Sequence, residues 1–293
     1  MRETIDQLIY ERANWMRGHR IQYRFARYFM RKMLGYEATV AKGEELLPMT
    51  GAEAMDNLAA EIARHVDADA LDAIPDKGAA MIVSNHPTGI ADGIMMWAVL
   101  RHHRPDLFFF ANGDAVRVLP QLEELIAPVE WRKDKRSHSH NRRTLIYAKK
   151  AFEEDRLAVL FPSGRLAKRR GLALHERDWM QSAGMMAKKW ELPVIPMHIT
   201  ARNSALFYLF DAIHPSFRDV TLFHETMNKT DHPYRIRVGR PFDGGALPAN
   251  SVEATETMKR AVLSLPGQDR PTLISPRLSP SSFVRKLVTS TSA

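Results

Sequence analysis

The chain has 293 residues, of which 45% are apolar and 26% charged, so it is globular and can bury the core of one large domain or two small ones. It contains no cysteine, which excludes disulfide bonds, a thiol nucleophile and thiolate metal sites. Its formal net charge of +8 indicates a polyanionic partner, which can be a nucleic acid, a phosphorylated substrate or an anionic membrane surface.

The N-terminal segment 1–36 is the most basic part of the chain. It holds eight Arg and Lys residues against three acids, which accounts for +5 of the net +8. Helical spacing puts five arginines on one face with no acid facing them, and five bulky apolar residues on a second stripe. The arginines are Arg17, Arg20, Arg24, Arg27 and Arg31, and the apolar residues are Ile21, Phe25, Tyr28, Phe29 and Met33. This pattern is typical of an interfacial helix in the headgroup plane of a membrane; a helix docked on its own domain is the alternative.

The start of the chain lacks the charged-then-apolar layout of a signal peptide, and no apolar run reaches the ~18 residues that a spanning helix needs. We therefore expect a chain that neither crosses a membrane nor carries an export signal. We find no DNA- or RNA-binding motif, and we expect no nucleic acid among its partners.

From residue 51 onward, the apolar spacing predicts a helix over 51–66 and then strands that alternate with helices from about residue 78. The predicted strands are Ala79–Val83, Leu107–Ala111, Ala127–Trp131, Leu157–Phe161, Pro193–Ile199 and Tyr234–Val238, and the predicted helices span about 91–103, 119–126, 141–154, 177–190 and 250–264. This order predicts an α/β fold with a mixed central sheet flanked by helices, behind the N-terminal basic amphipathic region.

We divide the chain into three parts. Residues 1–66 form the N-terminal helical, membrane-associating region, and residues 67–265 form the α/β domain. The tail at 266–293 is rich in Pro, Ser and Thr, so we expect it to be mobile.

The most informative stretch is Ser84–Gly93, which follows the first predicted strand and opens a helix. Pro87 biases His86 towards an extended conformation, and Gly89 permits a sharp turn, so Asp92 can fold back on the imidazole. A histidine with a carboxylate partner is the base half of a catalytic triad, and a substrate that brings its own hydroxyl needs no serine or cysteine. In the alternative interpretation Asp92 only caps the helix and His86 is a loop histidine.

The pattern Asn85-His86-Pro87-x-Gly89-x-x-Asp92-Gly93 resembles the first motif of the glycerolipid (lysophospholipid, 1-acylglycerol-3-phosphate) acyltransferase family. Its five residues between the histidine and the aspartate, where most members have four, resemble the NHPxGxxDG branch of hemolysin-like and lyso-ornithine-lipid acyltransferases. The resemblance implies that His86 is the general base that activates an acceptor hydroxyl, and that Asp92 orients it.

Later segments resemble the family's other motifs in order. Val129–Arg132 is similar to the second motif, which implies that Arg132 contacts substrate phosphate. Val194–Ile199 is similar to the fourth, apolar motif that shapes the pocket.

Phe161–Arg165 resembles the third motif, FPEGTR, with two departures. Ser163 stands where most members have glutamate, and Arg165 comes one position early. We expect Ser163, Gly164 and Arg165 to contact substrate: glycine lets a phosphate approach the backbone, and arginine offers a planar fork to phosphate oxygens.

The resemblance implies an O-acyltransferase that moves a fatty acyl group from acyl-CoA or acyl carrier protein to the hydroxyl of a lysolipid such as lysophosphatidic acid. It would be a peripheral protein on the cytoplasmic side of an anionic membrane, with no cofactor beyond the acyl donor. We expect no metal site, because His138 and His140 lack further ligands at a suitable spacing. The basic segments 132–150 and Lys168–Arg170 either bind coenzyme A phosphates, an acidic carrier protein or headgroups, or are solvated.

Two alternatives differ in function class. One is a membrane-binding protein of the same fold that has lost catalysis, which Ser163 favours and the intact His86 and Asp92 oppose. The other is acyl transfer to a non-lipid hydroxyl or amine.

Overall fold

The computed structural model describes residues 1–13, 17, 24, 28, 31–32, 34–130, 138–171 and 173–266. The helices are α1 (Arg2–Arg12), α3 (Tyr36–Leu46), α4 (Gly51–Ile62), α5 (Ile90–Leu100), α6 (Asp114–Val118), α7 (His138–Glu153), α8 (Ser182–Lys189), α9 (Ala205–Ile213), α10 (Pro215–Met227) and α11 (Ser251–Leu263), with 3-10 turns η2 (Leu71–Ala73), η3 (Pro120–Glu124) and η4 (Asn228–Asp231). The strands are β1 (Val66–Asp69), β2 (Ala80–Ser84), β3 (Phe108–Asn112), β4 (Ile126–Val129), β5 (Leu157–Leu160), β6 (Lys168–Arg170), β7 (Ala173–His175), β8 (Pro193–Thr200), β9 (Tyr234–Val238) and β10 (Phe242–Asp243).

The central sheet is mixed, as the sequence predicted. Its order is β1-β9-β8-β2-β5-β3-β4, with β10 beside β8. Strands β8, β2, β5, β3 and β4 are parallel, whereas β9 pairs antiparallel with β8. Val83 of β2 lies opposite both Leu160 of β5 and Pro196 of β8. The carboxyl ends of these three strands therefore meet at one edge, where open α/β sheets bind ligands.

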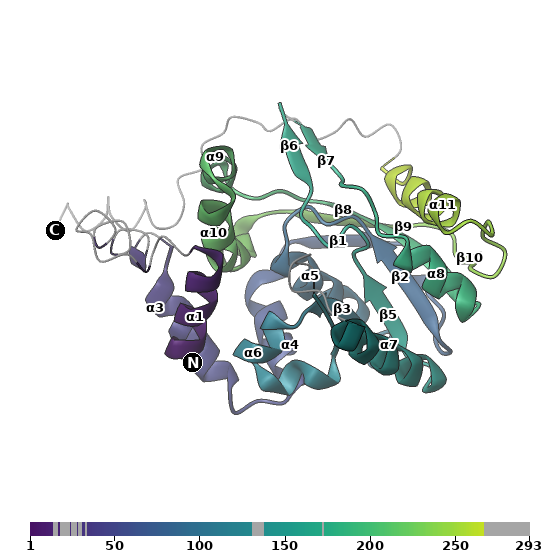
Figure 1. Ribbon diagram of the computed structural model, residues 1–293, viewed down its shortest axis with the longest axis horizontal. Coiled ribbons are helices and arrows are strands. Elements are labelled where there is room, and N and C mark those ends of the chain that lie inside the picture. Colours follow the sequence, from purple (N-terminus) through teal and green to yellow (C-terminus); the bar gives the residue numbers. More distant parts are fainter. Residues whose placement is uncertain are drawn as a thin grey trace.

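Helices cover both faces of the sheet (Figure 1). Successive strand residues point to opposite faces, and the central strands are apolar on both, so each face packs against helices. On one face, Ile82 and Val159 pack in a core with α4 and α5. On the other face, Met81 and Val83 pack in a second core with α7, α8 and α11. Strand β2 is buried along its whole length, which explains why it reads as a continuous apolar run.

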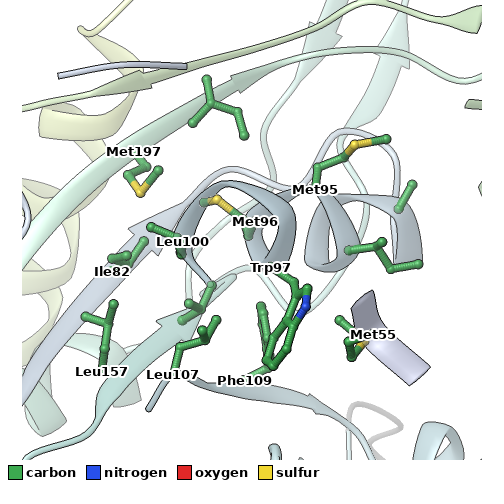
Figure 2. Packing of buried hydrophobic residues seen from close by; sticks show 14 of the residues in the cluster. Met55, Ile82, Met95, Met96, Trp97, Leu100, Leu107, Phe109, Leu157 and Met197 are labelled. Carbon is green, nitrogen blue, oxygen red and sulfur yellow. The ribbon is translucent and has the colours of Figure 1, made fainter. Parts of the chain in front are cut away.

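Helix α5 occupies the centre of the first core. Met95, Met96, Trp97 and Leu100 are at most 1% exposed and belong to the same cluster as Met55 of α4 (Figure 2). The core packs around the part of α5 that follows Asp92. Asp92 lies in the first turn of this helix, so it is attached to a rigid element at the edge of the sheet.

The N-terminal region packs against the rest of the fold through several of its helices. Helix α4 starts with a capping box, in which Thr50 and Glu53 exchange hydrogen bonds, and its Ile62 is buried in the first core. Helices α1 and α3 lie beside α10, and in that region Ala13 and Leu34 are buried against α9 and α10 (Figure 1).

The arginine stripe predicted over 17–31 is only partly described, since Arg20 and Arg27 lie outside the described residues. Arg31 pairs with Asp6 at 2.6 Å and stacks over Tyr36. The prediction that no acid faces the stripe is therefore wrong at Arg31, because the acid comes from the neighbouring helix α1.

Several predicted elements change at their boundaries. The helix predicted over 51–66 ends at Ile62, because Val66 already pairs with Tyr234 of β9. The helix predicted from residue 177 begins at Ser182, because the chain before it returns from an unpredicted hairpin, β6–β7, and buries Trp179. The aromatic run at 206–210 lies in α9, which the sequence analysis did not predict as a helix.

No helix among the described residues is both long and apolar enough to span a membrane. The predicted tail lies outside the described residues from position 267 onward.

Candidate active site

The loop after β2 carries the predicted histidine and is tied to the neighbouring strand β8. Asn85 makes two hydrogen bonds to the backbone of Ile199: its Nδ2 donates to the carbonyl oxygen at 2.9 Å, and its Oδ1 accepts from the amide at 2.7 Å. Asn85 is 6% exposed, so these bonds satisfy a buried amide. They fix the start of the loop at the carboxyl edge of the sheet.

The structure brings His86 and Asp92 together. The His86 Nδ1 atom lies 2.9 Å from Asp92 Oδ2, although the N–H direction is not aligned for a hydrogen bond. Catalytic contacts are often misaligned before substrate binds and tighten in the complex. Nδ1 faces the carboxylate, which leaves Nε2 as the ring nitrogen available to a substrate. The turn between the two residues requires Gly89, whose φ is +97°.

Asp92 is fully buried and is held by the first turn of α5. Its Oδ2 accepts from the amides of Thr88 at 2.9 Å and Gly89 at 3.0 Å, and its Oδ1 accepts from the Thr88 hydroxyl at 2.6 Å. The Thr88 hydroxyl also bonds the hydroxyl of Tyr234 on β9. These donors and the positive end of the helix dipole stabilise the carboxylate. Asp92 therefore caps the helix and contacts the imidazole at the same time, so the two interpretations of the sequence are compatible.

The ring of His86 packs against the third motif. It stacks on Phe161 with ring centroids 4.4 Å apart and an angle of 22° between the planes. The side chain remains 18% exposed, so the imidazole is held in place and still open to solvent. Because Phe161 directly follows β5, the stacking joins the ends of the adjacent strands β2 and β5.

Ser163, Gly164 and Arg165 form a tight turn beside this stack. The Gly164 amide donates to the Phe161 carbonyl at 2.9 Å, and the Ser163 hydroxyl donates to the Arg165 carbonyl at 2.7 Å. Gly164 has a φ of +59°, and a Cβ there would lie 3.1 Å from Met180. The Arg165 side chain is exposed. The turn thus places the Gly164 backbone next to Phe161, on which His86 stacks, and leaves the Arg165 side chain exposed.

Sequence reasoning missed Glu176, which contacts the backbone of the predicted base. The His86 amide donates to Glu176 Oε2 at 3.2 Å, and the indole N–H of Trp179 donates to Oε1 at 3.1 Å. Burial raises the pKa of Glu176, and hydrogen bonds from the His86 amide and from the side chains of Ser163 and Trp179 oppose that rise. The substitution of Ser163 for glutamate hinted that a carboxylate was missing, but nothing in the sequence located Glu176.

The comparisons find a known family over part of the chain. A sequence model of the family described as Acyltransferase matches residues 65–200, from just before β1 to the end of β8. The chain is similar to this family over the strands and helices that carry the candidate site.

Two relatives of this chain are named lyso-glycine lipid O-acyltransferase. The one from Phocaeicola vulgatus is 24% identical over 199 residues, which cover 66% of this chain and 67% of that protein. The one from Bacteroides thetaiotaomicron is 25% identical over 199 residues, which cover 64% of this chain and 71% of that protein. Among solved structures, the crystal structure of the 1-acyl-sn-glycerophosphate (LPA) acyltransferase PlsC from Thermotoga maritima is similar, with 13% identity and a TM-score of 0.46 over 90% of this chain and 96% of that chain.

The remaining predicted positions have different outcomes. Arg132 lies outside the described residues, so its predicted contact with substrate stays a prediction. Lys168–Arg170 form the exposed strand β6 of the hairpin. Among the described residues, no group of three or more His, Asp or Glu side chains is arranged to hold a metal ion.

A buried ion pair joins α10 to the 3-10 turn η4 that follows it. Lys229 and Glu225 are 0% and 1% exposed, and their charged groups are 3.1 Å apart. Glu225 also accepts from the amide and hydroxyl of Ser204, which begins α9. Burial lowers the pKa of Lys229, and the charges of Glu225 and Asp92 oppose that fall. Glu225 thus ties α10 both to η4 and to the start of α9.

Proposed function

We propose that this protein is an acyltransferase, which moves a fatty acyl group from the thioester of acyl-CoA or acyl carrier protein to the hydroxyl of a lysolipid. The observation that carries the proposal is the contact of His86 with the buried Asp92 at the carboxyl edge of the sheet. The names of the two relatives support a lysolipid acceptor.

In the proposed mechanism the lysolipid supplies the nucleophile. Nε2 of His86 takes the hydroxyl proton while the oxygen attacks the thioester carbonyl. The tetrahedral intermediate then collapses, the carbon–sulfur bond breaks, and the imidazolium returns its proton to the leaving thiolate. General-base assistance of this kind contributes ~10²–10⁴-fold. Asp92 stabilises the imidazolium and holds the ring, as in other His–carboxylate pairs.

The acceptor we propose has an anionic headgroup, as lysophosphatidic acid has. Arg165 is exposed on the turn beside His86, and a second guanidinium, Arg177, is nearby. Burial lowers the pKa of Arg177, and the positive charges of Arg218 and Arg165 lower it further. The charges of Asp211 and Glu176 oppose this fall, and Arg218 pairs with Asp211 and Asp219. We therefore propose the exposed Arg165 as the guanidinium that contacts a phosphate or carboxylate. Arg132 is proposed to contribute from the second motif.

We further propose that residues 1–66 bind the acyltransferase, as a peripheral protein, to an anionic membrane. An open hollow in this region is lined by residues of α1 and by basic and aromatic residues that follow it, namely Glu3, Asp6, Gln7, Tyr10, Arg17, Arg24, Tyr28 and Arg31. Tyr28 is 67% exposed, and Leu209 and Ile213 on the adjoining helix α9 are 56% and 61% exposed. Arginine beside exposed apolar side chains suits the headgroup layer. A chain without cysteine suits the reducing cytoplasmic side.

The test uses purified protein, labelled acyl-CoA and acyl carrier protein donors, and a panel of lysolipids with phosphate, glycine and ornithine headgroups. The expected result is a diacyl product that His86→Ala abolishes. His102→Ala is the matched control, because His102 is exposed beyond the opposite end of α5. If His86→Ala stays within a few-fold of the parent rate, the mechanism is wrong. Vesicle binding without turnover on any acceptor would instead identify a protein that has lost catalysis.

A further inference from the structure

The third motif of this chain lacks the acid that its resemblance to FPEGTR predicts. Ser163 occupies that position, is 6% exposed and donates its hydroxyl proton to the Arg165 carbonyl. The turn from Phe161 to Arg165 therefore contains no carboxylate of its own.

A segment further along the chain holds the peptide groups of His86 on both sides. The Ala167 amide donates to the His86 carbonyl at 2.8 Å, and the His86 amide donates to Glu176 Oε2 at 3.2 Å. The β6–β7 hairpin lies between these two contacts, and Arg177 closes its base through a bond from Nε to the Leu166 carbonyl at 2.9 Å. The chain thus contacts the His86 loop at Ala167, just before the hairpin, and again at Glu176, just after it.

Glu176 is itself fixed by its neighbours. Trp179, which is 7% exposed and belongs to the second core, bonds the other carboxylate oxygen. The Met180 amide donates to the Pro162 carbonyl at 2.9 Å, so the segment that carries Glu176 lies against the turn that contains Ser163. The carboxylate therefore comes from a segment packed against position 163, although it belongs to a residue 13 positions later.

We propose that Glu176 is a positioning residue that replaces the carboxylate absent at position 163 and holds the backbone of His86 in its catalytic place. This inference rests on the proposed role of His86 as general base.

Two physical effects follow from this arrangement. Without the Glu176 acceptor, the His86 amide loses a charge-assisted hydrogen bond, and the ring can shift relative to the acceptor hydroxyl. A displacement of about 1 Å at a reacting group costs about 10²-fold in rate. Its negative charge, held at the His86 backbone, also stabilises through space the positive charge that the reaction places on the ring. Removing the Glu176 carboxylate should therefore lower kcat by both effects and leave lysolipid binding unchanged.

The first measurement compares kcat and KM of Glu176→Ala and Glu176→Gln with those of the parent. We expect kcat to fall about 10²-fold for the alanine variant and about 10-fold for the glutamine variant, with KM unchanged within about 2-fold. The matched control is Asp178→Asn, which removes a fully exposed carboxylate two residues away and should retain the parent kcat. An unchanged kcat in both Glu176 variants, or a change confined to KM, overturns the proposal.

The second measurement asks whether a carboxylate at the motif position restores activity. The double variant Ser163→Glu/Glu176→Ala should recover most of the kcat that Glu176→Ala loses, because the new side chain starts beside the same space. If the double variant folds with the parent melting temperature and stays as slow as Glu176→Ala, the proposal that Glu176 replaces the motif carboxylate is overturned.

A third measurement does not depend on turnover, so it separates this inference from the proposed function. Diethyl pyrocarbonate modifies imidazole, and mass spectrometry of the peptide that contains His86 follows its rate. We expect faster modification of His86 in Glu176→Ala than in the parent or in Asp178→Asn, because the loop is held less firmly. Equal rates overturn the positioning role even if no lysolipid on the panel is acylated. If the parent protein acylates no lysolipid but His86 is modified faster in Glu176→Ala, only the acyl-transfer proposal is refuted.

Discussion

Replacing Asp92 by asparagine separates its two roles, which are to cap α5 and to hold the imidazole of His86. The asparagine side chain can keep an oxygen at the Oδ2 position, where the amides of Thr88 and Gly89 donate, so most of the cap survives. The negative charge beside the imidazole at 2.9 Å is lost. When the contact tightens during the reaction, a hydrogen bond from the imidazolium to a charged carboxylate contributes about 1.5–3 kcal/mol. An amide lacks that charge, so Asp92→Asn should lower kcat by up to about 150-fold.

The effect on stability should be smaller. A charge at the first turn of a helix contributes about 0.3–1 kcal/mol, and Asp92→Asn should lower the free energy of unfolding by about that amount. The assay combines steady-state kinetics on the best lysolipid with urea unfolding of the same preparations. His86→Asn serves as the comparison, since it removes the base without touching the cap.

The two interpretations of Asp92 give opposite results. If Asp92 orients the base, Asp92→Asn loses activity far beyond its loss of stability. If Asp92→Asn keeps kcat within about 2-fold while its stability falls by about 1 kcal/mol, Asp92 only caps α5 and our reasoning about the pair is refuted.

Three further predictions concern the scaffold. Lys229→Met should cost about 3–5 kcal/mol in urea unfolding, because it leaves Glu225 buried without its partner; a loss below about 1 kcal/mol would contradict this. Gly89→Ala should lower both melting temperature and kcat, because φ is +97° and a Cβ would meet Leu166 at 3.3 Å; parent-like values would refute the turn. Burial lowers the pKa of His198 to about 4, below its unfolded value of about 6.5, so stability should fall as pH drops from about 6.5 to 4, and His198→Gln should reduce that fall.

The local sequence determined the order of the elements and the main pair of the site. Continuous apolar runs identified β2 and β5, because strands buried on both faces need no polar alternation. The segment from His86 to Asp92 folds on itself, so its contact depends on Pro87, Gly89 and the start of a helix. Interactions within a few residues can be predicted from spacing, which is why this pair was found without the structure.

Tertiary structure decided what reaches the site from a distance. Glu176 meets His86 only because an unpredicted hairpin returns the chain to the carboxyl edge of the sheet, and no periodicity between positions 163 and 176 encodes that path. Likewise, the acid that pairs with Arg31 comes from α1, so counting acids within the basic stripe missed it. The net charge of +8 indicated a polyanion, but the partners of each individual charge depended on how separate segments pack.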